Sequence, residues 1–295
     1  MTDARLTVPL SGMGRRDGAI VGGKNASLGE MIKELDAAGV RVPPGFATTS
    51  HAYWTFIDAN GLRDVIARLV ASLQDGLANL ATVGSEIRSH ILGGTMPGDL
   101  QTAIRSAYRD LADQSGRDVL VAVRSSATAE DLPEASFAGQ LESYLGVRGE
   151  QQLLDAVRRC FASLFTDRAI SYRINNGFDH MAVALSVGVQ RMVRSDLAGA
   201  GVAFTVDTET GFPRAVLVTA GVGLGETIVQ GMVEPDEYHV FKPLLANTAL
   251  SPIIHKECGS KLQKLVCSLD NAAAPTELVA TTRSERDAYV LSDDE

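Results

Sequence analysis

Arg124 is one of two basic residues in this sequence whose surroundings suit phosphate chemistry. It follows an unbroken apolar run at residues 119–123, which predicts a short, fully buried strand that ends at the arginine. A guanidinium fixed there keeps its charge and offers five donors in a planar fork that suits phosphate oxygens. The small hydroxyl residues Ser125 and Ser126 follow directly. The alternative interpretation is a surface charge or a structural ion pair, which is the commoner role of an arginine at a strand end.

Lys24 is the second basic candidate. It follows two glycines, and the residues after it place apolar side chains on one face of an amphipathic helix: Leu28, Met31, Ile32 and Leu35. Glycines before a helix free the backbone to bring Lys24 to the N-terminus, where unpaired N–H groups and the dipole favour an anion. The alternative is a plain turn with a solvated lysine, because Gly-Gly-Lys lacks the full spacing of a P-loop.

A glycine-rich turn in the second half of the chain is a weaker candidate. Alternating glycines from Gly221 to Gly225 follow the apolar residues 215–218. Such a turn can bring backbone N–H groups to a phosphate or a ribose. A bulged hairpin is the alternative, and the pattern assigns no atom-level role to residues 221–226.

Read together, these motifs resemble the nucleotide-binding domain of the phosphoenolpyruvate synthase (pyruvate, water dikinase) family, which is related to pyruvate phosphate dikinase and rifampicin phosphotransferase. The resemblance is carried by Gly-Gly-Lys at 22–24, Val-Arg-Ser-Ser at 123–126, Ala-Gly-Gln at 138–140, Gly-Leu-Gly-Glu at 223–226 and Val-Glu-Pro-Asp at 233–236. It runs from about residue 21 to the last residue. The implied fold class is α+β, a two-lobed ATP-grasp-like nucleotide-binding domain of the pyruvate phosphate dikinase N-terminal type, truncated at its C-terminal end.

The resemblance also implies roles for individual residues. Lys24 and Arg124 match the family's phosphate-binding residues and are the expected catalytic pair. Further ATP-binding positions implied by the family are Gly139, Ser143, Gln190, Met192 and Val193. Ser143 stands where the family has threonine, and it keeps the hydroxyl but loses the methyl. Residues 187–193 resemble the family's adenine-binding hinge, where an open strand edge would bind adenine through its backbone while Met192 and Val193 cover the ring.

The implied activity converts ATP, pyruvate and water to phosphoenolpyruvate, AMP and phosphate through a phosphohistidine outside this chain. The expected cofactors are ATP and Mg²⁺, and the family's metal-binding Ile-Glu-Trp and Gln-Ala-Arg-Pro motifs do not occur in these residues. We therefore expect the metal ligands beyond Glu295, pyruvate binding in C-terminal domains that are missing here, and no activity from this stretch alone. The alternatives are the ATP-binding domain of a rifampicin phosphotransferase, or an inactive nucleotide-binding fragment of an interrupted gene.

Composition excludes several other classes. A net charge of −9 gives no electrostatic case for nucleic acid as a partner. The three cysteines, Cys160, Cys258 and Cys267, include no Cys-x-x-Cys pair, which favours a reducing compartment over a disulfide framework or a zinc site. There is no signal-peptide pattern and no apolar run of membrane-spanning length, so we expect a cytoplasmic protein. The resemblance implies a gluconeogenic role.

The spacing of apolar residues predicts two lobes. Residues 50–76, 82–112 and 151–165 have helical periodicity, and β-rich segments follow at 182–190, 199–207, 215–220, 237–242 and 261–269. We predict a helix-rich N-terminal lobe over residues 1–180 that carries Lys24 and Arg124. A β-rich lobe over residues 181–295 would carry the adenine hinge and the glycine-rich turn. Ser292 and Glu295 have the spacing of a capping box, which predicts the start of a helix in a longer chain; the alternative is a frayed acidic tail.

Overall fold

The strand predicted before Arg124 is β3 (Leu120–Ala127), and it does not end at the arginine. It continues because Ser125 and Ser126 are buried and pair across the sheet with Val187 and Ser186. Arg124 therefore lies in the middle of a strand.

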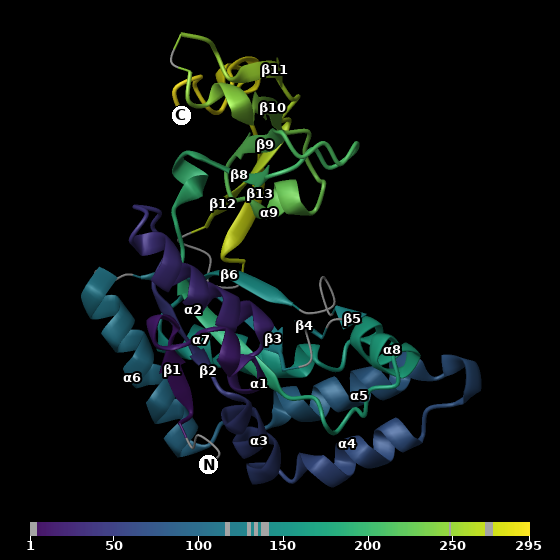
Figure 1. Ribbon diagram of the computed structural model, residues 1–295. Coiled ribbons are helices and arrows are strands. Elements are labelled where there is room, and N and C mark those ends of the chain that lie inside the picture. Colours follow the sequence, from purple (N-terminus) through teal and green to yellow (C-terminus); the bar gives the residue numbers. More distant parts are fainter. Residues whose placement is uncertain are drawn as a thin grey trace. The chain divides into compact units, whose positions relative to one another are not determined.

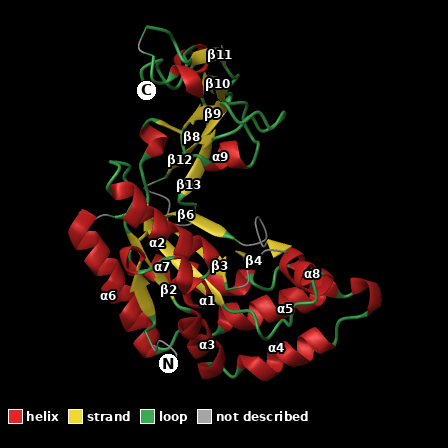
Figure 2. Cartoon of the chain, in the orientation of Figure 1, coloured by secondary structure: helices red, strands yellow, loops and turns green. Residues whose placement is uncertain are grey.

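In this computed structural model, residues 5–115, 119–128, 131–132, 135–136, 142–247, 249–268 and 274–295 are described (Figures 1 and 2).

The chain forms two compact units, Met1–Met192 and Val193–Glu295. The sequence placed the division after residue 180. The structure places it after Met192, because β7 (Leu185–Arg191) pairs with β2 (Gly45–Thr48) on one side and β3 on the other. The strand predicted to belong to the second lobe is therefore the central strand of the first unit.

The first unit combines a mainly antiparallel sheet with helices on both faces. Its five-stranded sheet has the order β1-β2-β7-β3-β6, and every neighbouring pair is antiparallel. The remaining strands of the unit are β1 (Thr7–Pro9), β4 (Asp131–Leu132), β5 (Ala135–Ser136) and β6 (Ser143–Arg148). The helices are α1 (Gly18–Val21), α2 (Gly23–Asp36), α3 (Ser50–Ala59), α4 (Leu62–Ala71), α5 (Leu80–Gly93), α6 (Gly98–Ser115), α7 (Glu150–Ser163) and α8 (Asp167–Asn175).

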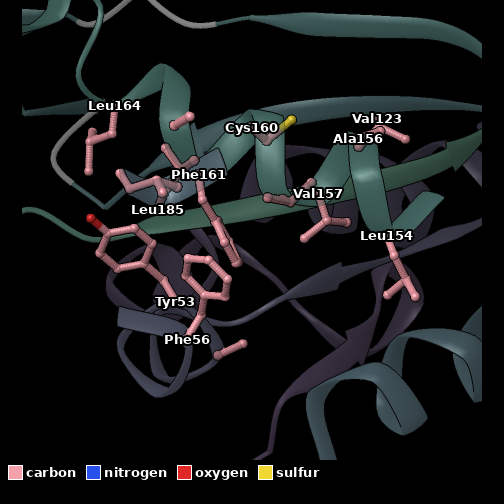
Figure 3. Close-up of a cluster of buried hydrophobic side chains, with 14 of the residues drawn as sticks. Tyr53, Phe56, Val123, Leu154, Ala156, Val157, Cys160, Phe161, Leu164 and Leu185 are labelled. Carbon is pink, nitrogen blue, oxygen red and sulfur yellow. The ribbon is translucent and has the colours of Figure 1, made fainter. Parts of the chain in front are cut away.

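The main core lies between one face of this sheet and helices α3 to α8 (Figure 3). The helical pattern predicted at 151–165 is confirmed, because Leu154, Val157, Phe161 and Leu164 are all buried. Phe161 packs against Tyr53 and Phe56 with ring centroids 5.4 and 5.5 Å apart. Each such fully buried side chain contributes about 1.5–3 kcal/mol to the stability of the first unit.

A smaller core lies on the opposite face, under α1 and α2. The predicted helix after Lys24 is confirmed, and Leu28 and Ile32 of its predicted apolar face are half-buried against this core. Met31 is 40% exposed, whereas Asn25, Ala26 and Gly29 are buried. A Cβ on Gly29 would lie 2.5 Å from the carbonyl oxygen of Met13, so α2 approaches the segment before it most closely at this glycine.

The second unit is β-rich, as predicted. A four-stranded antiparallel sheet has the order β11-β10-β9-β8, and β12 and β13 form a separate pair. The elements are β8 (Gly199–Phe204), β9 (Ala215–Val222), α9 (Glu226–Val229), β10 (Asp236–Phe241), β11 (Ile253–Glu257), β12 (Gln263–Cys267), β13 (Thr276–Ala280) and α10 (Arg283–Asp287). β8, β9, β10 and β12 were predicted, and β11 and β13 were not. Ser292 and Glu295 do contact each other, with the Ser292 N–H donating to Glu295 Oε2 at 2.9 Å.

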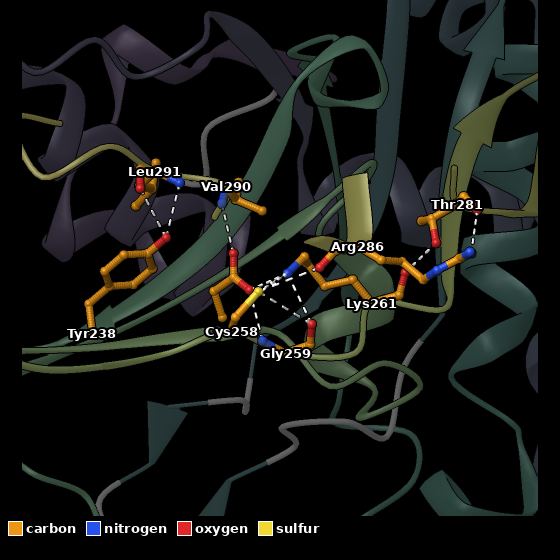
Figure 4. A network of polar contacts seen from close by, with 9 residues as sticks. Tyr238, Cys258, Gly259, Lys261, Thr281, Arg286, Val290 and Leu291 are labelled. Carbon is orange, nitrogen blue, oxygen red and sulfur yellow. Dashed lines mark hydrogen bonds and ion pairs between the residues drawn. The ribbon is translucent and has the colours of Figure 1, made fainter. Parts of the chain in front are cut away.

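A buried ion pair joins the strands of the second unit (Figure 4). The side chains of Asp236 and Lys261 are 0% and 1% exposed and form a direct ion pair. The Asp236 carboxylate also accepts hydrogen bonds from the N–H groups of Gly259, at 2.9 Å, and Val290, at 2.7 Å. Lys261 donates further to the carbonyl oxygen of Gly259 at 3.0 Å. The network ties the start of β10 to the turn before β12 and to the C-terminal segment.

His180 makes the first unit sensitive to acid. Arg173 Nε donates to His180 Nδ1 at 2.8 Å, so the imidazole must be neutral at that nitrogen. Burial, together with the Arg173 charge, lowers the pKa of His180 from 6.5 to about 4. Because the folded-state pKa lies below the unfolded one, this stabilisation is complete above about pH 6.5 and is lost as the pH falls toward 4.

We expect the free energy of unfolding to decrease between pH 6.5 and 4.5, by at most about 1.4 kcal/mol per pH unit from this histidine. Urea unfolding measures this free energy at each pH. The fluorescence of Trp54, the one tryptophan of the sequence, follows the unfolding. His180→Gln should flatten that part of the profile, whereas His51→Gln, at an exposed position, should not. An unchanged slope in His180→Gln would assign the acid sensitivity to other groups.

Candidate functional site

Arg124 and most of its predicted partners in the first unit lie on one face of the sheet. In an antiparallel pair, residues directly opposite each other point to the same face, and so do residues two apart on one strand. Arg124 lies opposite Gly188 on β7 and opposite Ser143 on β6. Gln190, two residues beyond Gly188, shares this face. It is the face that α1 and α2 cover, opposite the main core (Figure 1).

The loop before Lys24 rests directly on the end of β3. Gly22 adopts a φ of +73°, and a Cβ there would lie 2.3 Å from Ser126 Oγ and 2.5 Å from the Ser126 carbonyl oxygen. Only glycine combines this backbone conformation with so close an approach. Gly22 is the N-cap of α2, and no side chain caps the helix. The exposed Lys24 is therefore held in the first turn of α2, on the sheet face that carries Arg124.

Asn25 fastens this first turn to the sheet. Its side chain is buried, and Nδ2 donates to Ser186 Oγ and to the carbonyl oxygen of Val21, each at 2.9 Å. A Cβ on Gly188 would lie 2.2 Å from Asn25 Oδ1. The sequence analysis missed Asn25 and Gly188. A polar residue directly after Lys24 and a glycine inside an apolar strand were the available signals, since a glycine in a strand often marks a close backbone approach.

Gln190 connects Arg124 to the segment before β2. Its side chain is 8% exposed. Gln190 Oε1 accepts from Arg124 Nη1 at 3.1 Å, and Gln190 Nε2 donates to the carbonyl oxygen of Pro43 at 2.9 Å. The guanidinium is thus oriented by a neutral amide that is itself fixed to the backbone.

The expectation of an open strand edge at Gln190 is wrong. β7 is the central strand of its sheet, and Gln190 pairs with Gly45 on one side and Ala122 on the other. The next two N–H groups are also bonded, that of Arg191 to the carbonyl oxygen of Pro44 and that of Met192 to that of Leu120. The backbone here is therefore committed to the sheet, and adenine contact by these residues stays a prediction.

The other predicted residues are more scattered. Ser143 is exposed, opposite Arg124. Gly139 lies outside the described residues. Met192 Sδ accepts from the Gly146 N–H at 2.9 Å, and Val193, which is 62% exposed, begins the second unit.

The glycine-rich turn has a packing role inside the second unit. Gly223 adopts a φ of +92°, and a Cβ there would lie 2.8 Å from the carbonyl oxygen of Leu265. The N–H of Leu224 donates to that same oxygen at 2.9 Å. Gly223 is therefore required where the turn after β9 meets β12.

Neither a metal cluster nor a membrane helix is found in the part of the chain that the structure describes. No group of three or more His, Cys, Asp or Glu side chains gathers there in an arrangement that could hold a metal ion. None of the described helices combines the length and apolar character needed to cross a membrane.

Comparison with known proteins identifies similar sequences across nearly the whole chain. Residues 18–295 match the family of the pyruvate phosphate dikinase AMP/ATP-binding domain. A phosphoenolpyruvate synthase of Synechocystis is 53% identical over 289 residues, which are 96% of this chain and 35% of that protein. The phosphoenolpyruvate synthase of Aquifex aeolicus is 50% identical over 94% of this chain and 32% of its own length. That of Escherichia coli is 47% identical over 96% of this chain and 36% of its own length. The chain thus spans about a third of the length of these curated relatives.

Proposed function

Because the chain belongs to the family of pyruvate phosphate dikinase AMP/ATP-binding domains, we propose that it binds ATP as the nucleotide-binding part of a phosphoenolpyruvate synthase. The contact of Gly22 with Ser126 carries this proposal, because it brings the Lys24 turn and the Arg124 strand together on one sheet face. Two cations on a rigid support suit a polyphosphate, whose transfer depends mainly on positioning and charge neutralisation. The synthase names of the relatives favour this function over rifampicin phosphotransferase.

The proposed roles follow from the positions of the residues. Lys24 and Arg124 neutralise and orient the phosphates and form the catalytic pair. Ser143, opposite Arg124, adds a hydroxyl that donates to the same phosphates. Gly139 is proposed as a close backbone contact on the resemblance alone, and Met192 and Val193 as apolar contacts of the adenine. The finer fold assignment, a two-lobed ATP-grasp-like domain, belongs to this proposal as well.

The complete reaction is proposed for the longer protein type that the relatives represent. ATP, pyruvate and water would yield phosphoenolpyruvate, AMP and phosphate through a phosphohistidine outside this chain, in the cytoplasm and in a gluconeogenic role. Pyruvate would bind in parts of the relatives that this chain does not match. Mg²⁺ would neutralise charge on the ATP phosphates. The described residues include no group of three or more His, Cys, Asp or Glu side chains that could hold this ion.

Replacing Arg124 tests the proposal. We expect Arg124→Ala to weaken ATP binding about tenfold or more, since hydrogen bonds to charged groups contribute about 1.5–3 kcal/mol. AMP should bind within about twofold of the wild-type affinity, because an arginine that acts on the β- and γ-phosphates loses little with AMP. The ATP affinity of Arg124→Lys should lie between those of the wild type and Arg124→Ala, since lysine keeps the charge and loses the planar fork. Calorimetric titration of the 295-residue protein measures all three.

Arg109→Ala is the matched control. Arg109 is another arginine of the first unit, and it forms an ion pair with Glu150 on α7. It should leave both affinities unchanged. Equal losses of ATP and AMP affinity in Arg124→Ala, or a lowered melting temperature with normal ATP affinity in the folded fraction, would remove Arg124 from the phosphate site.

A further inference from the structure

We propose that Gln190 is a positioning residue that holds the Arg124 guanidinium in place for the ATP phosphates and does not bind the adenine. This inference rests on the proposed function. Arg124 Nη1 donates to Gln190 Oε1, and Gln190 Nε2 donates to the Pro43 carbonyl oxygen. The side chain is 8% exposed, and both ends of its amide are used within the protein.

The chemistry of the two partners fixes the amide in one orientation. A guanidinium can only donate and a carbonyl oxygen can only accept, so the amide oxygen must face Arg124 and the amide nitrogen must face Pro43. Glutamate could accept from Arg124 but could not donate to Pro43. Leucine and methionine have a similar size but make neither bond. Of the side chains of this length, glutamine alone satisfies both partners without placing a charge beside the arginine.

The Pro43 carbonyl is a fixed anchor. Pro43 and Pro44 restrict φ, which stiffens the segment. The Arg191 N–H donates to the Pro44 carbonyl oxygen at 2.9 Å, so the segment is bonded to the end of β7. Gly45 permits this closeness, because a Cβ there would lie 2.2 Å from the Val189 carbonyl oxygen and 2.9 Å from Gln190 Cα.

Such an anchor matters because an arginine side chain has many rotamers. Holding it in one of them costs rotamer entropy, and a side chain that is already oriented has lost part of that entropy before ligand binds. A planar fork binds two phosphate oxygens only when its plane is correctly turned. By accepting from Nη1, Gln190 restricts the orientations that the plane can take.

Nucleotide binding by Gln190 variants separates positioning from adenine contact. We expect Gln190→Leu to weaken binding of ATP and of inorganic triphosphate about fivefold to tenfold, with AMP within about twofold, because only the phosphate contacts depend on Arg124. Gln190→Glu should also weaken ATP and triphosphate binding, since its carboxylate offsets the guanidinium charge. Isothermal titration with the three probes measures this, and Trp54 fluorescence confirms that each variant is folded.

A double-mutant cycle provides the second measurement. In an Arg124→Ala background, Gln190→Leu should cause no further loss of ATP affinity, because the residue acts through Arg124. Gln152→Leu is the matched control. The Gln152 side-chain oxygen accepts a hydrogen bond from the backbone N–H of Arg148 at 3.1 Å. Gln152 lies on α7, whereas Arg124 lies on β3. It should leave ATP and AMP affinities at their wild-type values.

Two results would overturn the inference in different ways. If the wild type binds both nucleotides and Gln190→Leu loses ATP and AMP affinity equally, with triphosphate unaffected, Gln190 contacts the base and only the positioning role fails. Additive losses of ATP affinity in the double-mutant cycle would show that Gln190 does not act through Arg124, and the positioning role would fail. If the wild-type protein binds none of the three probes, the proposed function fails and the positioning role fails with it.

Discussion

Gly22→Ala is expected to abolish measurable ATP binding and to destabilise the first unit by about 3 kcal/mol. The alanine would have to keep a φ of +73° with a ψ of 160°, a conformation that costs an L-residue about 1–3 kcal/mol. Its Cβ would also lie 2.3 and 2.5 Å from two oxygen atoms of Ser126, one of them in the backbone. Since neither β3 nor the loop can yield cheaply, the first turn of α2 must move and carry Lys24 with it.

Urea unfolding monitored at Trp54 measures the stability, and titration with ATP measures the binding. Gly18→Ala is a matched control, because Gly18 begins α1 with no atom within 4 Å of its Cβ position. A helical glycine replaced by alanine should be neutral or slightly stabilising. Gly22→Ala protein with wild-type stability and wild-type ATP affinity would show that the loop does not position Lys24.

Lys261→Met is expected to destabilise the second unit by about 3–5 kcal/mol, because removing one partner of a buried ion pair leaves the other charge uncompensated. The Asp236 carboxylate would keep its two backbone N–H donors and lose its only ion-paired cation among the described residues. Methionine fills a similar volume, so loss of packing contributes little. Hydrogen–deuterium exchange should accelerate in peptides that contain β10 and β12.

Lys256→Met is the control for this measurement. Lys256 also pairs with an aspartate of the second unit, Asp293, but the two side chains are 33% and 63% exposed, so the pair should contribute less than about 1 kcal/mol. Combining Lys261→Met with Asp236→Asn should cost less than the sum of the single changes, since the carboxylate charge is then absent. Exchange rates in Lys261→Met equal to those of the wild type would show that solvent reaches Asp236.

Local patterns predicted many of the elements. The apolar run at 119–123 predicted β3, and the helical spacing of Leu154, Val157 and Phe161 predicted the buried face of α7. Both patterns are local, because the spacing of apolar residues within one element shows which side of that element is buried. The predicted end of β3 at Arg124 failed because a strand continues through a charged residue when its neighbours remain paired on the other face.

Pairing between distant segments could not be predicted in the same way. Nothing near Gln190 indicates that β7 lies between β2 and β3, and the expectation of an open edge came from the resemblance of residues 187–193 to the family's adenine hinge. The bond from Gln190 to Pro43 depends on the same pairing. Asn25 was overlooked because a polar residue in the first turn of a helix usually contacts solvent or caps the helix, whereas here it contacts Ser186 on β7.

The order of strands in the first sheet affects how this protein folds during synthesis. Gln190 and Pro43 are 147 positions apart in sequence, and β7 is the last strand of the sheet to leave the ribosome. Until it does, β2 and β3 lack the strand that pairs between them, and the β7 side of β3 has no partner in the sheet. Pairings of this length form slowly and leave nascent chains prone to aggregation, so we expect chaperone dependence to be greatest for chains that end before residue 185.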